Sequence, residues 1–177
     1  DNEILLSKLN NLYKENIFYI NKSEIEEFFN SNSLIESYEV FKRYPSTLDV
    51  NIKKTNFLAK INKDGKIFLV GSNGKLTSEE KVYRNLPYIF GKLNIEEFLA
   101  FKKILDDSKF SYNQIQNLFF FPSKRWDIEL KENILIKLPN NVTDKELDLI
   151  YQLIENYNDK NLTIVDFRIK NQIILNE

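Results

Sequence analysis

The 177-residue sequence contains no cysteine, no histidine and no methionine. The first two absences remove cysteine and histidine zinc sites, thiol nucleophiles and any base that works through an imidazole ring. A metal site built from carboxylates stays open, and a chain without thiols fits either redox compartment. Because the chain does not begin with methionine, we expect it to be a fragment, with a signal or a membrane anchor ahead of Asp1.

An excess of charge of one sign is also absent. Lysine and arginine number 25, aspartate and glutamate number 26, and the formal net charge is −1. Proteins that bind duplex nucleic acid usually carry a basic excess, so the composition argues against a nucleic-acid partner. Long hydrophobic runs are missing as well, because none approaches the ~20 apolar residues of a membrane-spanning helix.

The sequence does hold enough apolar material for a folded core, since 42% of its residues are hydrophobic and 14% are aromatic. Apolar residues at helical spacing predict a helix near residues 2–15. Asn21, with Glu24 three residues later, is typical of a helix N-terminus and predicts a second helix. The same capping pattern predicts two later helices, at Asn94 with Glu97 and at Thr143 with Glu146.

The stretch VFKRYPSTLDVNIKK predicts a β-hairpin with strands near 35–43 and 47–54. Proline fixes its own φ and lacks the amide hydrogen of a sheet ladder, so Pro45 belongs in the turn. Alternation with polar residues places three apolar side chains of the second strand on one face, toward a core: Leu48, Val50 and Ile52.

The second half of the chain is rich in strand signals. Asp64-Gly65 and Asn73-Gly74 are typical turn sequences. The first stretch lacks the further oxygen ligands of a calcium loop, and the second lacks the full spacing of a phosphate loop, so a turn is the simpler interpretation of both. Apolar runs and alternation predict strands near 115–121, 126–131, 134–138, 162–169 and 172–177. Asp127 and Glu129 share a face of one of these strands, and we interpret that face as solvated.

Two features near the C-terminus are more specific. Asp166 and Arg168 stand two residues apart and share one face of a strand, which predicts a partly exposed ion pair. The final segment, Gln172–Glu177, is apolar and extended. It is either an edge strand, which can accept a strand from a partner, or a strand buried inside the sheet.

Five stretches in one order carry a family resemblance. They are the hairpin residues Val40, Arg43, Tyr44-Pro45, Thr47-Leu48, Val50 and Ile52, then LVGSNGKL (69–76), LPYIFG (Leu86–Gly91), RWDIELKENILIKLP (125–139) and IVDFRI (Ile164–Ile169). Together these stretches resemble the FtsQ/DivIB family of bacterial cell-division proteins. The motifs are weak singly, but as a set they are fairly specific and span nearly the whole chain. The sequence departs from the family pattern at Lys54, Phe57, Ile169 and near Gln172.

The resemblance implies an α+β chain with two domains. Residues 1–55 are expected to form a POTRA-type domain, whose first strand lies ahead of Asp1 or is absent from this chain. Residues 56–177 are expected to form the β domain of the family, an antiparallel sheet with flanking helices. The resemblance also implies a single-pass anchor in the bacterial inner membrane upstream of this fragment, with the fragment itself in the periplasm.

The function that the resemblance implies is a non-enzymatic scaffold of the division machinery, without cofactors. FtsB-type and FtsL-type division proteins are the expected partners, joined by strand addition at the C-terminal edge, while other membrane proteins of the divisome contact the POTRA domain. The expected partner-binding residues are Lys124, Arg125, Arg168, Ile169, Lys170, Gln172, Ile173, Ile174 and Leu175. Two other classes stay open: a POTRA-containing component of outer-membrane assembly or translocation, and a wall hydrolase that uses two converging carboxylates.

Overall fold

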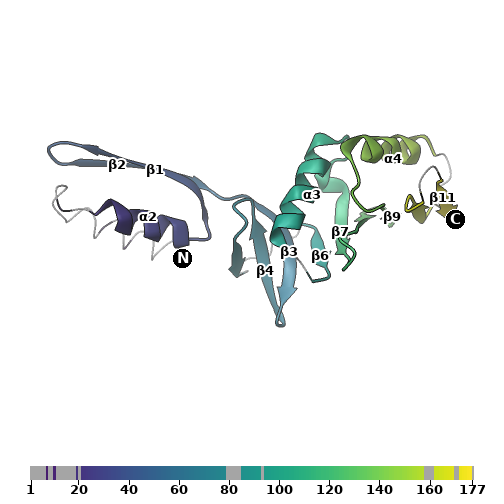
Figure 1. Ribbon diagram of the computed structural model, residues 1–177, viewed down its shortest axis with the longest axis horizontal. Helices are drawn as coiled ribbons and strands as arrows, with labels where there is room; N and C mark the ends of the chain where they lie inside the picture. The colour runs from purple at the N-terminus through teal and green to yellow at the C-terminus, as the bar shows by residue number, and fades with distance from the viewer. Residues whose placement is uncertain are drawn as a thin grey trace. The chain divides into compact units, whose positions relative to one another are not determined.

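The computed structural model describes residues 21–78, 85–92, 94–157, 162–169 and 172–176, together with Ser7, Asn10 and Tyr19. The fold is α+β, and Figure 1 shows its helices and strands. The chain divides into two compact units, the first of Asp1–Phe57 with Gly71–Thr77, the second of Leu58–Val70 with Ser78–Glu177. The helix expected at 2–15 lies outside the described residues, apart from Ser7 and Asn10. The domain division at 1–55 and 56–177 stays a prediction.

In the first unit, helix α2 (Lys22–Ser31) begins where the sequence predicts. The side-chain oxygen of Asn21 accepts a hydrogen bond from the amide of Ser23 at 3.0 Å. This bond satisfies one of the amides that have no partner at a helix start. The helix buries Ile25 and Phe29, which form a small core with Ile35. Figure 1 shows α2 alongside the hairpin that supplies the rest of this core.

That hairpin consists of β1 (Ile35–Arg43) and β2 (Thr47–Lys54), with Val40 opposite Val50 in an antiparallel pair. Pro45 lies in the turn, as the sequence predicts. The predicted inward face is also confirmed, because three half-buried side chains of β2 pack against the small core: Leu48, Val50 and Ile52.

The turn at Gly71–Lys75 completes the first unit. Lys75 Nζ donates hydrogen bonds to the main-chain oxygens of Asn30 and Asn32, where α2 ends. Carbonyl groups at a helix C-terminus lack partners within the helix and carry partial negative charge, so a lysine there is favourable. Asn73 Nδ2 donates to the oxygen of Ile35 at 2.8 Å. The sequence predicts the turn itself but not its capping of α2.

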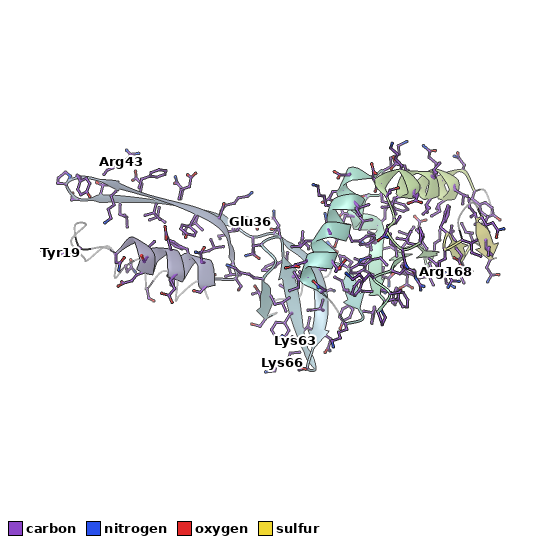
Figure 2. The ribbon with its side chains drawn as sticks, viewed as in Figure 1. Tyr19, Glu36, Arg43, Lys63, Lys66 and Arg168 are labelled. Carbon is purple, nitrogen blue, oxygen red and sulfur yellow. The ribbon has the colours of Figure 1, made fainter. Side chains whose placement is uncertain are left out.

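The second unit contains most of a nine-stranded sheet with the strand order β11-β10-β9-β8-β7-β6-β3-β4-β5. Its strands are β3 (Phe57–Lys63), β4 (Lys66–Gly71), β5 (Leu76–Ser78), β6 (Tyr88–Phe90), β7 (Ile115–Phe120), β8 (Trp126–Leu130), β9 (Leu135–Lys137), β10 (Ile164–Asp166) and β11 (Ile174–Asn176). Asp64 and Gly65 join β3 to β4 with φ values of 54° and 78°, which is the tight turn that Asp-Gly predicts. Figure 2 labels the lysines on either side of it, Lys63 and Lys66.

The sheet is mixed, which corrects the antiparallel sheet expected from the resemblance. β3 pairs with β6, β6 with β7, and β9 with β10 in parallel. Parallel neighbours need a crossover connection, and α3 (Ile95–Asp107) and α4 (Asp144–Asn156) supply two of them. α3 connects β6 to β7 and α4 connects β9 to β10, so both connections run in the direction of β11, and all four strands point the same way. Because crossovers are right-handed, α3 and α4 lie on the same face of the sheet (Figure 1).

Both helices begin at the caps that the sequence predicts. The side chain of Asn94 accepts a hydrogen bond from the amide of Glu96 at 2.9 Å, at the start of α3. Thr143 and Glu146 bond reciprocally at the start of α4, which is a complete capping box. A short 3₁₀ helix, η1 (Tyr112–Gln114), leads into β7.

The main core lies between the sheet and these two helices. The ring of Trp126 on β8 stacks on Phe101 of α3, with centroids 4.9 Å apart and planes 2° from parallel. Leu147 and Ile150 of α4 are fully buried. Successive side chains of a strand point to opposite faces, so Asp127 belongs to the sheet face opposite α3 and α4. We call that face the far face.

Candidate partner-binding site

The C-terminal strand lies at an edge of the sheet. β11 pairs antiparallel with β10, with Leu175 opposite Val165, and it is the last strand of the order among the described residues. Of the two alternatives that the sequence leaves open, the structure therefore has the edge strand. Ile174 on this strand is 51% exposed. An edge strand presents main-chain donors and acceptors that another strand can pair with.

An apolar groove of about 550 Å³ lies beside this edge. Leu149 and Ile150 of α4 form one side, while Phe167, Ile169 and Ile173 contribute from the C-terminal segment. Ile169 and Ile173 are exposed, as a binding surface requires. Two more predicted site residues, Arg168 and Gln172, also line the groove. Lys170 lies outside the described residues.

Arg168, which Figure 2 labels, is held by the carboxylate two residues before it, as the sequence predicts. Its Nη2 donates to Asp166 Oδ2 at 2.6 Å, and its Nε donates to Asp166 Oδ1 at 2.9 Å. These hydrogen bonds from Arg168 lower the pKa of Asp166 from its ordinary value, and the same pairing raises the pKa of Arg168. The carboxylate is nearly buried, but the arginine side chain remains 45% exposed. Arg168 therefore keeps a fixed position and an accessible charge.

Asp127 corrects the prediction of a solvated face, because it is only 3% exposed. It accepts a hydrogen bond from Arg125 Nε at 3.1 Å and another from the amide of Leu138 at 3.2 Å. The guanidinium of Arg125 also lies over the ring of Phe121, 4.1 Å from its centroid. Asp127 is buried because β8 lies between β7 and β9 and because the side chain of Arg125 folds back onto it. Glu129 is half-buried there and accepts from Asn117.

Lys124, which the sequence predicts as a partner-binding cation beside Arg125, forms its ion pair with a side chain of α3. It has a φ of 63° in the turn before β8, and its Nζ donates to Glu97 of α3 at 2.6 Å. The hydrogen bond to Glu97 raises the pKa of Lys124. Since α3 covers the opposite face of the sheet, the described pairing directs Lys124 away from Arg125 and Arg168.

Arg125 and Arg168, in contrast, line one shallow depression of about 270 Å³ on the far face. Lys137 of β9 lies between them, directly opposite Asp127 on one side and Asp166 on the other. Lys137 is a residue of this depression that the sequence does not predict. Its alternation with Ile136 and Leu138 places it on the far face, but only the pairing of β9 with both neighbours brings it to the two aspartates.

The described residues hold neither a candidate metal site nor a candidate membrane span. Among them, no group of three histidine, cysteine, aspartate or glutamate side chains is arranged to hold a metal ion. Within the same residues, no helix has the length and apolar character that crossing a membrane requires. The C-terminal edge itself offers an edge strand, an exposed apolar side chain at Ile174 and a groove beside them.

Comparison with known families matches this architecture along the chain. Residues 1–54 match the model of the POTRA domain, FtsQ-type, and residues 51–168 match that of the cell division protein FtsQ/DivIB, C-terminal. The second model alone covers more than half of the 177 residues. Both matches agree with the α+β fold and with the POTRA-type and FtsQ-type parts that the sequence predicts.

Individual relatives carry the same names. The chain is 26% identical over 178 residues to the cell division protein FtsQ of Rickettsia typhi, covering 97% of this chain and 66% of the relative. It is 33% identical over 76 residues to the cell division protein DivIB of Clostridium botulinum, covering 42% of this chain and 29% of the relative. The chain thus spans less than two thirds of the length of these relatives.

Proposed function

The chain belongs to the FtsQ/DivIB family of cell-division proteins, and from that premise we propose that it is a non-enzymatic scaffold of the division machinery. It binds FtsB-type and FtsL-type division proteins at the edge formed by β11, while other membrane proteins of the divisome contact its POTRA-type domain. The exposed edge strand is the observation that carries this proposal. Family membership also favours this function over an outer-membrane assembly component.

Strand addition explains how such an edge would bind. A partner segment beside β11 pairs its main chain with the edge, and alternate side chains then provide selectivity. Ile174 offers an exposed apolar contact on this strand. The adjacent groove, walled by Leu149 and Ile173, accepts an apolar side chain of the partner. Full burial of one such side chain contributes roughly 1.5–3 kcal/mol, so the groove holds the partner while the strand aligns it.

The two held arginines favour a partner segment that carries carboxylates. Arg125 and Arg168 border one depression, and their own aspartates fix both guanidinium groups. Exposed charges of this kind accelerate association and lose strength as salt rises, whereas the apolar contacts and strand pairing set most of the lifetime. Lys124 has a smaller part in this scheme, because Glu97 already engages it.

The same residues support a scaffold over a carboxylate-dependent hydrolase. Asp127 and Asp166 flank Lys137 on the far face, and such a hydrolase would need two acids that converge. A general acid needs a raised pKa, but hydrogen bonds from Arg168 lower the pKa of Asp166. The carboxylate of Asp127 is occupied by Arg125 and by a main-chain amide.

We also propose that this part of the protein lies in the periplasm, attached to the inner membrane by a single-pass anchor. The natural lack of cysteine allows a direct test, because a Ser46→Cys substitution in the exposed hairpin turn creates the only thiol of the described sequence. A maleimide that cannot cross the inner membrane should label it in intact cells. Labelling only after the inner membrane is broken would contradict the proposed location.

The partner site is tested by calorimetry against the soluble domain of the FtsB-type protein from the same genome. Ile174→Pro removes one main-chain donor from β11 and restricts its φ, so we expect binding to weaken at least tenfold. Ile174→Glu should weaken it as well. Ile67→Glu is the matched control, because Ile67 on β4 is 43% exposed and lies away from β11 in the sheet order.

Far-ultraviolet circular dichroism should confirm that each variant is folded. Unchanged affinity in Ile174→Pro and in Lys124→Glu, with folding intact, would place the partner elsewhere, on the POTRA-type domain. An equal loss in Ile67→Glu and Ile174→Glu would mean that the edge strand has no special role.

A further inference from the structure

A small pocket lies at the end of the sheet where β8 turns into β9. Its floor is apolar, since Phe110 and Leu130 are 6% and 5% exposed. The ring of Tyr151 on α4 meets Phe110 edge-on, with centroids 5.5 Å apart. The volume of the pocket is about 180 Å³. Sites for whole small molecules usually occupy roughly 300–1,000 Å³, so this pocket has room for a single side chain.

Exposed charged side chains surround the mouth of this pocket. Lys131 and Glu132 belong to the turn between β8 and β9, and Glu155 belongs to the last turn of α4. Neither carboxylate forms an ion pair or a hydrogen bond with another described residue. Two carboxylates against one ammonium group leave the mouth with one net negative charge, so it favours a cation.

The position of Glu155 is unfavourable for the helix that carries it. Carbonyl groups at a helix C-terminus carry partial negative charge, so an acidic side chain there is disfavoured and a basic one is favoured. The last turn of α4 contains no basic residue. A cation beside Glu155 would therefore be attracted both by its carboxylate and by the end of the helix.

Gln114 adds a polar atom without a partner to the lining. Its main-chain oxygen accepts a hydrogen bond from the amide of Lys131 at 2.9 Å, which fixes the residue at the end of η1. Its side-chain Oε1 is buried and accepts no hydrogen bond from a described residue. Buried polar atoms in folded proteins are usually hydrogen-bonded, so this acceptor suits a ligand that brings an N–H donor.

We propose that this pocket binds an arginine side chain of a protein partner. The guanidinium group carries the charge that Glu132 and Glu155 attract. Its planar fork has five N–H donors, enough for a carboxylate and for the side-chain oxygen of Gln114 together. Its flat face also suits the ring of Tyr151. A lysine ammonium group lacks both the fork and the flat face.

The size and the surroundings of the pocket favour a protein segment over a free small molecule. The pocket holds one side chain, and its mouth consists of exposed residues such as Asn113 and Lys131, so the main chain that bears the arginine would lie across the surface. The pocket shares no lining residue with the groove beside β11. It is therefore a second contact that goes beyond the proposed edge site and does not depend on it.

The experiment titrates the full chain with a capped tripeptide that has arginine at its centre, followed by nuclear magnetic resonance. We expect the signals of Phe110, Gln114 and Tyr151 to shift with one dissociation constant on the order of 1 mM, as a ligand of this size allows. The same tripeptide with citrulline in place of arginine is the matched probe, because it keeps the shape and loses the charge. It should bind about tenfold more weakly.

Variants test the acidic mouth and the buried acceptor separately. The double change Glu132→Gln with Glu155→Gln should weaken binding of the arginine tripeptide about tenfold, whereas Glu96→Gln, exposed on α3 outside the pocket, should not. Gln114→Met keeps the length of the side chain and removes the acceptor, so we expect about threefold weaker binding. Its control is Gln116→Met, on an exposed position of β7. If Gln114 has only a structural role, its substitution will change the free energy of unfolding and leave the affinity unchanged.

Three results would overturn the inference. The first is equal affinity for the arginine and citrulline tripeptides, or no shift of the three signals at about tenfold excess over the expected dissociation constant. The second is a set of shifts spread over surface carboxylates in general, which would show unspecific attraction. The third is tighter binding of spermidine than of the arginine tripeptide, which would assign the pocket to a free polyamine. None of these results bears on the Ile174→Pro test, so the edge site stands or fails separately.

Discussion

Lys75 Nζ donates a hydrogen bond to the main-chain oxygen of Asn30 and so connects the turn after β4 to the end of α2. The same ammonium group reaches the oxygen of Asn32 at 3.2 Å. Residues distant in sequence thus complete the cap of a helix that begins near the start of the described chain. The first unit consequently depends on the Gly71–Lys75 turn for its stability.

We expect Lys75→Met to weaken α2 while leaving the hairpin packing in place. Methionine keeps the apolar stem but removes the charge at the helix C-terminus, at a cost of about 1 kcal/mol. Hydrogen exchange at the amides of α2 should accelerate about fivefold. Lys66→Met, in the exposed lysine at the start of β4, is the matched control and should leave these amides unchanged.

The register of the hairpin yields a second prediction. Val50→Asp places a carboxylate against Ile25 and Phe29, so we expect the first unit to lose about 2–3 kcal/mol and its amides to exchange much faster. Asn51→Asp introduces the same group one residue later on an exposed position and should have little effect. Equal exchange rates in the two variants would show that the assigned face of β2 is wrong.

Local patterns could be predicted from the sequence because their causes are local. The capping box of Thr143 and Glu146 and the turn at Pro45 both involve groups a few residues apart. The family resemblance added the order of the parts, and the family matches confirm it. It did not predict the parallel strand pairs, because those depend on where α3 and α4 cross the sheet.

The geometry of the candidate site, in contrast, could not be predicted from local patterns. Alternation alone assigned Asp127 to a solvated face, but β9 pairs beside it and the guanidinium of Arg125 folds onto it, and alternation predicts neither the strand pairing nor the ion pair. Lys137 meets Asp166 only because α4 returns the chain to the neighbouring parallel strand. Lys124 and Arg125 are adjacent in sequence, yet a positive φ at Lys124 directs the former to Glu97.

Because the pKa of Tyr112 is raised in the folded protein, we expect the free energy of unfolding to fall at high pH. Its hydroxyl donates to the main-chain oxygen of Leu58 at 2.8 Å, and burial raises its pKa above the ordinary value, with a smaller contribution from Asp106. Above pH ~10 the unfolded tyrosine ionises while the folded one stays protonated, so rising pH favours unfolding. Tyr112→Phe cannot contribute to this loss.

The measurement is the free energy of unfolding against pH, followed by the fluorescence of Trp126, the only tryptophan. At neutral pH the variant should be about 1 kcal/mol less stable, because it lacks the hydrogen bond to Leu58. Above pH 10 the two curves should approach each other. A constant difference across this range would show that Tyr112 does not titrate differently in the folded and unfolded states.

Because the pKa of Asp166 is lowered in the folded protein, we expect the free energy of unfolding to fall in acid. Hydrogen bonds from Arg168 lower its pKa, so the unfolded carboxylate takes up a proton before the folded one as pH falls below about 4. The stabilisation from this pair is therefore complete at neutral pH and is lost progressively between pH ~4 and the lower pKa of the folded state.

We expect Asp166→Asn to flatten this part of the curve of unfolding free energy against pH, again followed by the fluorescence of Trp126. Asp144→Asn, at the start of α4 and away from Arg168, is the control and should retain the steep acid limb caused by the Asp166 pair. The reverse order, with Asp144→Asn flattening the curve and Asp166→Asn leaving it steep, would remove the Asp166–Arg168 pair as the main acid-sensitive contact of the second unit.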